Sequence, residues 1–154
     1  MHILMCNDDG ILADGLRQLA TYLSQYYRVT VVAPATEQSA KSHALTTEIP
    51  LKLDAYNGED ENPRLYALTG TPSDCMKFGL SYLLADDMPD LVISGINHGF
   101  NLGSDVLYSG TVSAAMESAF YGIPGLALSV ERYSIERGYE MHPFIHELIE
   151  KIYV

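Results

Sequence analysis

The sequence predicts an α/β fold in which a doubly wound, mostly parallel sheet carries helices on both faces. Short runs of β-forming residues alternate with longer segments whose apolar residues recur at helical spacing, the order expected of strands connected by crossover helices. A chain of 154 residues, 47% hydrophobic and 19% charged, is also long enough to bury one core. We therefore expect residues 1–154 to form a single domain.

The first strand–helix–strand unit is expected at the amino-terminal end of the chain. A strand is predicted over residues 2–6, and a second buried strand over residues 29–33. Between them, apolar residues at helical spacing form a stripe suited to packing on the sheet. This stripe consists of Leu16, Leu19, Ala20, Leu23 and Tyr27. Residues 51–56 and 64–69 are predicted to be short strands that form an excursion hairpin beyond this unit.

A capped helix is expected to begin after Thr71. Thr71 is a good N-cap residue, Pro72 suits the first helical position, and Asp74 brings a negative charge near the positive end of the helix dipole. The apolar positions of this helix are Cys75, Phe78, Gly79, Tyr82 and Leu83. Residues 91–94 form the next predicted strand, and a long loop rich in glycine and asparagine is expected over residues 95–109.

Two helices and a strand complete the predicted order. The first helix follows residue 109 and ends at Gly122, with Pro124 behind it. Its predicted apolar face consists of Val112, Ala115, Met116 and Ala119. Residues 126–130 form a strand, and a last helix is expected over residues 142–153. The apolar side of that helix consists of Ile145, Leu148, Ile149 and Ile152.

Composition excludes several classes of partner. Nine basic against twenty acidic residues give a net charge of −11 and a pI near 4.6, which argues against binding to a nucleic acid polymer. No apolar run approaches the roughly twenty residues that span a bilayer, and two acids interrupt the amino-terminal segment where a signal peptide would stay apolar. Cys6 and Cys75 lie in apolar segments, so we expect free thiols and a cytoplasmic protein.

The chemistry is expected in the loops after the strands, because ligands of open parallel sheets bind outside the carboxyl ends of the strands. Asp8 and Asp9 follow the first strand, and adjacent buried carboxylates are costly unless a cation or hydrogen-bond donors compensate them. Ser39, Asn97 and Asn101 add oxygen donors in neighbouring loops, which suits a hard ion such as Mg²⁺ or Mn²⁺. The alternative is that the aspartates only cap and solvate the first helix.

A second feature is the start of the helix after residue 109. Ser109, Gly110 and Thr111 place free backbone N–H groups there, and such a terminus favours bound anions. Lys41 is the one basic residue close in sequence to these loops, so a phosphate would need a cation and backbone N–H groups to neutralise it. The alternative is an ordinary N-cap without a ligand.

Several known motifs are absent. The glycines do not spell G-x-G-x-x-G, and neither a phosphate-binding G-x-x-x-x-G-K-[ST] loop nor a G-x-S-x-G nucleophile elbow occurs. His142 and His146 are expected on the surface of the last helix, because Pro143 stands where a zinc protease has glutamate. His43 and His98 lie in the loops of interest, as candidates for substrate contact or proton transfer or for structural hydrogen bonds.

Five motifs, taken together and in order, resemble the SurE family (survival protein E), a group of metal-dependent nucleotidases. The match runs from residue 2 to about residue 130. The motifs are Asn7-Asp8-Asp9-Gly10, Ala33-Pro34 with Gln38-Ser39 and Ser42-His43, Gly70-Thr71-Pro72-Ser73-Asp74-Cys75, Ser94-Gly95-Ile96-Asn97, and Asn101-Leu102-Gly103 leading to Asp105-Val106-Leu107-Tyr108-Ser109-Gly110-Thr111-Val112. Cys6 and Thr36 depart from the family pattern at positions that are not ligands.

The resemblance implies a Rossmann-like fold and hydrolysis of nucleoside 5′- and 3′-monophosphates, with short polyphosphate as a further substrate of some members. It implies one divalent metal ion held by Asp8, Asp9, Ser39 and Asn97, with Asp8, Asp9 and Asn97 as the catalytic residues. The turn from Ser109 through Gly110 to Thr111, together with Asn101, would lie near the phosphate.

The resemblance also bears on assembly, because family members continue past residue 154 into a segment that completes the fold and supplies subunit contacts. We therefore expect residues 1–154 to lack that segment, and a homodimer or higher homo-oligomer to form where it is present.

The expected mechanism is attack on phosphorus by a water molecule that the metal ion activates. Two other readings stay open. An aspartyl-phosphate phosphatase would use a strand-end carboxylate as nucleophile, although Asp8 and Asp9 are adjacent where that class has D-x-D. A non-catalytic nucleotide-binding or regulatory domain is the third reading, because a fold does not fix a function.

Overall fold

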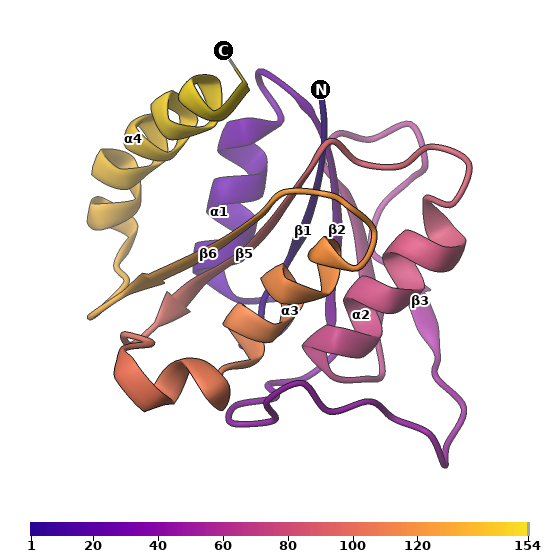
Figure 1. The fold of residues 1–154 in the computed structure, drawn as a ribbon. Helices are drawn as coiled ribbons and strands as arrows, with labels where there is room; N and C mark the ends of the chain where they lie inside the picture. Colours follow the sequence, from indigo (N-terminus) through magenta and orange to yellow (C-terminus); the bar gives the residue numbers. More distant parts are fainter. Residues whose placement is uncertain (154) are drawn as a thin grey trace.

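The computed structural model describes residues 1–153 and confirms the predicted α/β class. Its sheet has the strand order β3-β4-β2-β1-β5-β6, and every neighbouring pair is parallel except β3 with β4 (Figure 1). The strands are β1 (His2–Cys6), β2 (Arg28–Pro34), β3 (Leu53–Ala55), β4 (Arg64–Leu68), β5 (Leu91–His98) and β6 (Gly125–Val130). The antiparallel β3–β4 pair is the predicted excursion hairpin.

Helices cover both faces of the sheet (Figure 1). The helical elements are α1 (Asp14–Leu23), α2 (Pro72–Phe78), the π-helical turn η1 (Gly79–Leu83), the 3₁₀ turn η2 (Gly103–Leu107), α3 (Gly110–Ala119) and α4 (Ile135–Tyr153). α1 packs with α4 over one face and α2 with α3 over the other. β1 alternates between the two cores, since Ile3 and Met5 join the first and Leu4 and Cys6 the second.

The predicted cap of α2 is confirmed, and so is its apolar stripe except at Tyr82, since Gly79 is buried and Leu83 packs against the core. The Thr71 hydroxyl accepts from the Asp74 N–H while the Asp74 carboxylate accepts from the Thr71 N–H, which is a capping box. The helix then widens into the π-helical turn, and this shifts the buried positions along the chain. Leu80 and Leu84 are buried in place of Tyr82, which is 79% exposed.

The predicted inward face of α3 is wrong. Met116 is 54% exposed, whereas the neighbouring residue, Glu117, is buried together with small residues of the helix. These small buried residues are Gly110, Ser113, Ala114 and Ser118. Small residues let α3 pack closely, and the buried hydroxyls of Ser113 and Ser118 donate to carbonyl groups within the helix. A prediction from the periodicity of apolar residues alone therefore took the exposed face of α3 as its buried face.

The long loop predicted over residues 95–109 is shorter than expected. β5 continues through His98 with an irregularity between Ser94 and Asn97 in its pairing with β6. Gly95 makes this possible, because its φ of +124° is a left-handed conformation and a Cβ there would lie 2.3 Å from the Leu128 carbonyl oxygen. The 3₁₀ turn η2 then orders residues 103–107.

α4 begins earlier than predicted, at Ile135, and the surface assignment of His142 is wrong. His142 is only 4% exposed, and its ring centroid lies 5.4 Å from that of Tyr22 on α1. Burial holds the pKa of His142 below its ordinary value, so the ring packs as a neutral group. Within residues 1–153, no helix combines the length and hydropathy needed to cross a membrane.

The turn between β3 and β4, residues 57–63, lies at the amino-terminal edge of the sheet, because β4 runs parallel to β2. Asn62 anchors it: the side-chain amide donates to the carbonyl oxygens of Ser24 and Tyr27, and its oxygen accepts from the Val29 N–H. The tip of the turn, Glu59, Asp60 and Glu61, is exposed and acidic. This edge is opposite the carboxyl ends of the parallel strands.

Candidate active site

A cleft of about 530 Å³ lies at the carboxyl ends of the parallel strands, where ligands of such sheets bind. Its lining includes six of the eight predicted site residues. We call it the acidic cleft, and its lining is Asp8, Asp9, Glu37, Ser39, Ala40, Asn97, His98, Gly99, Phe100, Asn101, Asp105, Tyr108 and Ser109. The other two predicted residues, Gly110 and Thr111, adjoin it through direct contacts with Asp8.

The turn after β1 presents the two aspartates. The side chain of Asn7 is fully buried and closes the turn, donating to the Gly10 carbonyl and accepting from the Gly10 N–H, each at 3.1 Å. The Asp8 carbonyl accepts from the Gln38 N–H at 2.7 Å, which fastens the turn to the loop after β2. The position of both carboxylates is therefore fixed by buried backbone contacts of β1 and its neighbour.

The amino terminus of α3 packs directly against Asp8. The Thr111 hydroxyl donates to the Asp8 carboxylate at 2.7 Å, and Ser109 caps the helix by accepting from the Val112 N–H at 3.2 Å. Gly110 permits the close approach, since a Cβ at this position would lie 2.9 Å from the Cβ of Asp8. The free N–H groups of the first turn of α3 thus lie beside the carboxylates.

The negative charge of the acidic cleft is not balanced by any cationic side chain in its lining. The lining includes four carboxylates and neither lysine nor arginine, and Lys41 is exposed outside it. Burial raises the pKa of Asp8, which is 7% exposed. The pKa of Asp9 is raised by burial first, and then by the charges of Asp8 and Glu37. Ionised, these carboxylates would be strongly stabilised by a bound cation.

Two asparagines also line the cleft. The Asn97 amide nitrogen donates to the Gly99 carbonyl at 2.8 Å, and the Asn101 amide nitrogen donates to the Ser129 hydroxyl at 2.7 Å. Because each nitrogen is engaged within the protein, each side-chain oxygen is the atom available to a ligand. Ser39 lines the cleft with its hydroxyl donating to the Glu37 carboxylate at 2.6 Å.

The donor chemistry fits a hard divalent cation. Within residues 1–153 no group of three or more histidine, cysteine, aspartate or glutamate side chains lies close enough together to hold a metal ion. The predicted ligand set does not require one, because it combines two carboxylates with a hydroxyl and an amide oxygen, all of them oxygen donors. The observation that supports the fit is the pair of carboxylates, Asp8 and Asp9, in a lining that has neither lysine nor arginine to balance their charge.

The sequence prediction gave no role to five side chains that line the cleft, namely Glu37, Ala40, Phe100, Asp105 and Tyr108. These residues lie in the same loops as the predicted site residues. The loop positions could therefore have indicated them, whereas their residue types alone point to no particular role. Of the two candidate histidines, His98 lines the acidic cleft, whereas His43 makes a structural contact with Glu117 at 2.6 Å.

Neutralising Asp8 is expected to stabilise the metal-free protein at neutral pH. The pKa of Asp8 is higher in the folded chain than its ordinary value of 3.8, so the folded state binds more protons and loses stability as pH rises above that value. Asp8→Asn removes the charge and keeps an oxygen that can accept from Thr111. We expect a melting temperature about 2–4 °C higher at pH 7, with EDTA present.

The pH dependence provides the control for this prediction. At a pH well below 3.8, where Asp8 is protonated in both states, the two melting temperatures should converge. A variant that is less stable than the wild type at pH 7 would contradict the prediction.

Comparison with known proteins agrees with the resemblance. The family model described as "Survival protein SurE" matches residues 3–154. The chain is 51% identical over 152 residues to "5'-nucleotidase SurE" of Thermoanaerobacter sp. (strain X514), a match that covers 99% of the chain and 60% of that protein. It is 54% identical over 139 residues to the protein of the same name from Thermosipho africanus, covering 88% of the chain and 52% of that protein.

A solved structure shows the same fold. "Crystal Structure of Sure Protein from Aquifex aeolicus" superposes with a TM-score of 0.86 at 40% sequence identity, covering 99% of the chain and 60% of that protein. The chain thus spans between about half and three fifths of the length of these relatives. The family match over nearly every residue, the close relatives and the shared fold lead to one conclusion: the chain belongs to the SurE family.

Proposed function

We propose that the acidic cleft hydrolyses nucleoside 5′- and 3′-monophosphates to nucleoside and phosphate with the help of one divalent metal ion, Mg²⁺ or Mn²⁺. The observation that carries the proposal is the pair of carboxylates, Asp8 and Asp9, in a cleft lined by neither lysine nor arginine, with Asp8 in contact with the amino terminus of α3. A phosphate placed there would meet free N–H groups on one side and a carboxylate-bound cation on the other. The names of the close relatives, each a 5'-nucleotidase, support the same activity.

Each residue has an assigned role. Asp8, Asp9, Ser39 and Asn97 would hold the ion, which when bound lowers the pKa of a coordinated water and offsets phosphate charge. The N–H groups of Gly110 and Thr111, with Ser109 and Asn101, bind and orient the phosphate. These are the predicted roles, assigned to residues that line or adjoin the acidic cleft.

Hydrolysis needs two proton transfers. Water oxygen forms a bond to phosphorus while the bond from phosphorus to the ribose oxygen breaks. Asp9 accepts the proton that the water loses. The leaving ribose oxygen takes up a proton, for which His98 on the same cleft wall is the candidate donor.

Phosphate release from a panel of 5′- and 3′-monophosphates, each with Mg²⁺, Mn²⁺ or EDTA, tests the proposal. We expect turnover with the metal ions and none with EDTA. Tight nucleotide binding without release would favour the non-catalytic reading. A trapped phosphoaspartate would favour the aspartyl-phosphate reading. Either outcome would contradict the mechanism proposed above.

Phe100 is expected to recognise the base. Phe100 and Tyr108 line the cleft with exposed rings, 55% and 63% exposed, and base–aromatic stacking contributes about 1–3 kcal/mol. Phe100→Ala should therefore lower kcat/KM for AMP about tenfold and leave that for ribose 5-phosphate, which has no base, nearly unchanged. Leu102→Ala is the matched control, because Leu102 is 66% exposed and outside the lining. Equal losses on both substrates would contradict a role in base recognition.

The remaining proposals concern the cellular compartment of the protein and its binding partners. Cys6 and Cys75 are both free and buried, which supports a reducing compartment such as the cytoplasm. The absence of lysine and arginine from the cleft lining supports a small substrate in preference to a nucleic acid polymer. Assembly into a homodimer or higher homo-oligomer stays a prediction.

A further inference from the structure

A short segment just beyond Ser39, residues 42–46, is fastened to several other parts of the protein, and we call it the tether segment. Its first residue is held by the end of η2. The Ser42 N–H donates to the Tyr108 carbonyl at 3.2 Å, and the Ser42 hydroxyl donates to the Leu107 carbonyl at 2.8 Å. The tether segment therefore begins against the turn that leads into α3.

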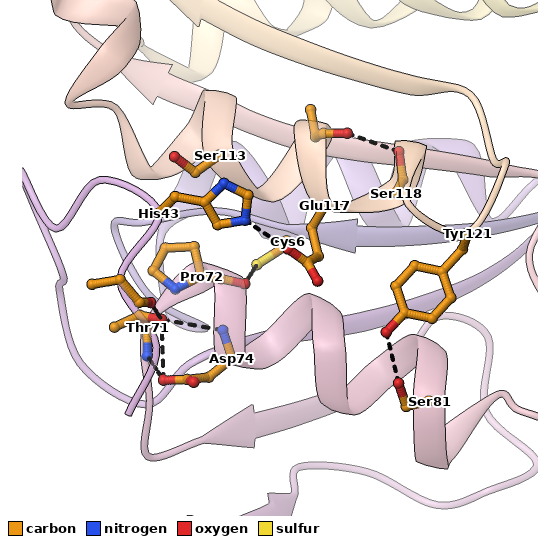
Figure 2. Close-up of polar contacts among 12 residues, drawn as sticks. Cys6, His43, Thr71, Pro72, Asp74, Ser81, Ser113, Glu117, Ser118 and Tyr121 are labelled. Atoms are coloured by element: carbon orange, nitrogen blue, oxygen red, sulfur yellow. Dashed lines mark hydrogen bonds and ion pairs between the residues drawn. The ribbon is translucent and has the colours of Figure 1, made fainter. Parts of the chain in front are cut away.

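The far end of the tether segment is bound to the amino terminus of α2. The Thr46 N–H and hydroxyl donate to the Asp74 carboxylate at 3.0 and 2.6 Å, and the Thr71 hydroxyl donates to the Ala44 carbonyl at 2.6 Å. Figure 2 shows Thr71 and Asp74 together in the capping box. The cap of α2 thus also serves as an anchor for this segment.

Between these two ends, a buried carboxylate of α3 holds the middle of the tether segment. Nε2 of His43 lies 2.6 Å from Oε2 of Glu117, and Figure 2 shows the His43 ring meeting the Glu117 side chain beside α3. Glu117 is 7% exposed, and His43 is the one hydrogen-bond partner of its carboxylate in the part of the chain that the structure describes. Without His43, a carboxylate would stay buried and unpaired, which is costly.

The backbone next to Ser39 is strained and needs such support. Ala40 has a φ of +56° and Ser42 a φ of +53°, both in the left-handed region that side chains other than glycine disfavour. Such conformations persist only where the surrounding structure holds them in place. If the tether segment were released, relaxation at Ala40 would move its neighbour Ser39 on the cleft wall.

We propose that Glu117 is a positioning residue: through His43 it holds the tether segment on α3 and so keeps Ser39 on the wall of the acidic cleft. This inference rests on the proposed function, in which Ser39 is a metal ligand. α3 carries Glu117 and also packs its first turn on Asp8, so one helix would set the spacing of two ligands. Removing a group that orients a ligand typically weakens metal binding about 10- to 100-fold.

Four single variants of the chain and the double variant Glu117→Ala/His43→Ala test the inference. Glu117→Ala and His43→Ala break the pair, whereas Glu117→Gln keeps an oxygen that can accept from the His43 ring. Met116→Ala is the matched control, because Met116 adjoins Glu117 on α3 and is 54% exposed. Each variant is titrated with Mn²⁺ alone and followed by electron paramagnetic resonance. Hydrogen exchange of residues 39–46 and the melting temperature are measured without metal.

We expect the Kd for Mn²⁺ to rise about tenfold in both broken-pair variants and to change less than about twofold in Glu117→Gln and Met116→Ala. The double variant should lose no more affinity than either single one. Exchange of residues 39–46 should be faster in the broken-pair variants, with β1 unchanged.

Two results would be decisive against these expectations. Unchanged Mn²⁺ affinity in Glu117→Ala and His43→Ala, with only a lower melting temperature, would overturn the inference and leave the proposed function standing. A wild-type chain that binds no Mn²⁺ would overturn both.

Discussion

Asp9→Asn is expected to lower metal-dependent phosphate release from AMP by at least about 1,000-fold. Asp9 would lose both of its proposed tasks, because an amide is a weak metal ligand and does not accept the proton from the attacking water. The substitution preserves size and leaves the turn built by Asn7 and Gly10 intact. Initial rates with Mn²⁺ at saturating AMP are the measurement, and Asn97→Ala should show a loss of similar size.

The control for this prediction is Asp60→Asn, in the exposed turn at the far edge of the sheet. It removes the same charge from the protein, so it reports any general effect of net charge on substrate attraction. Its rate should match that of the wild type. If the Asp9→Asn variant had a rate near that of this control, the Asp9 carboxylate would have no part in the mechanism.

Gly95→Ala is expected to cost about 3–5 kcal/mol of the free energy of unfolding. An added Cβ would lie 2.3 Å from the Leu128 carbonyl oxygen, far inside contact distance, and the φ of +124° is unfavourable for alanine. Because β5 must then separate from β6 or change its path, the position of Asn97 would change as well. Urea unfolding followed by circular dichroism measures the loss.

Gly99→Ala separates the two causes. Gly99 has a similar φ of +113°, but a Cβ there would have no atom within 4 Å, so only conformational strain remains. We expect a loss of about 1–2 kcal/mol in this variant. Equal losses at the two positions would show that the overlap with Leu128 is relieved at little cost.

The fold was predictable to the extent that it depends on local pattern. β1, β2 and the excursion hairpin follow from short β-forming runs, and the start of α2 follows from the cap chemistry of Thr71, Pro72 and Asp74. The buried positions that follow α2 and those of α3 were not fully predictable. After α2, the π-helical turn at Gly79 shifts the buried positions along the chain. In α3, Glu117 can be buried because it pairs with His43, which lies 74 residues away in the sequence.

The candidate site was predictable because a general rule places ligands at the carboxyl ends of parallel strands. The rule and the resemblance together selected Asp8, Asp9, Ser39, Asn97 and Asn101, and all five line the acidic cleft. The rest of the lining depends on how each loop folds back across the sheet edge. No local pattern gives that path, which is why Glu37 and Asp105 were found only in the structure.

The turn over residues 57–63 is a suitable place to attach a tag or a label. It lies at the opposite edge of the sheet from the acidic cleft, and its fixed part is Asn62, while Glu59, Asp60 and Glu61 are exposed. A peptide tag or a fluorophore spliced between Asp60 and Glu61 should be tolerated there. Protein captured on a surface through this insertion would present the mouth of the cleft to solution, which suits binding measurements on an immobilised sample.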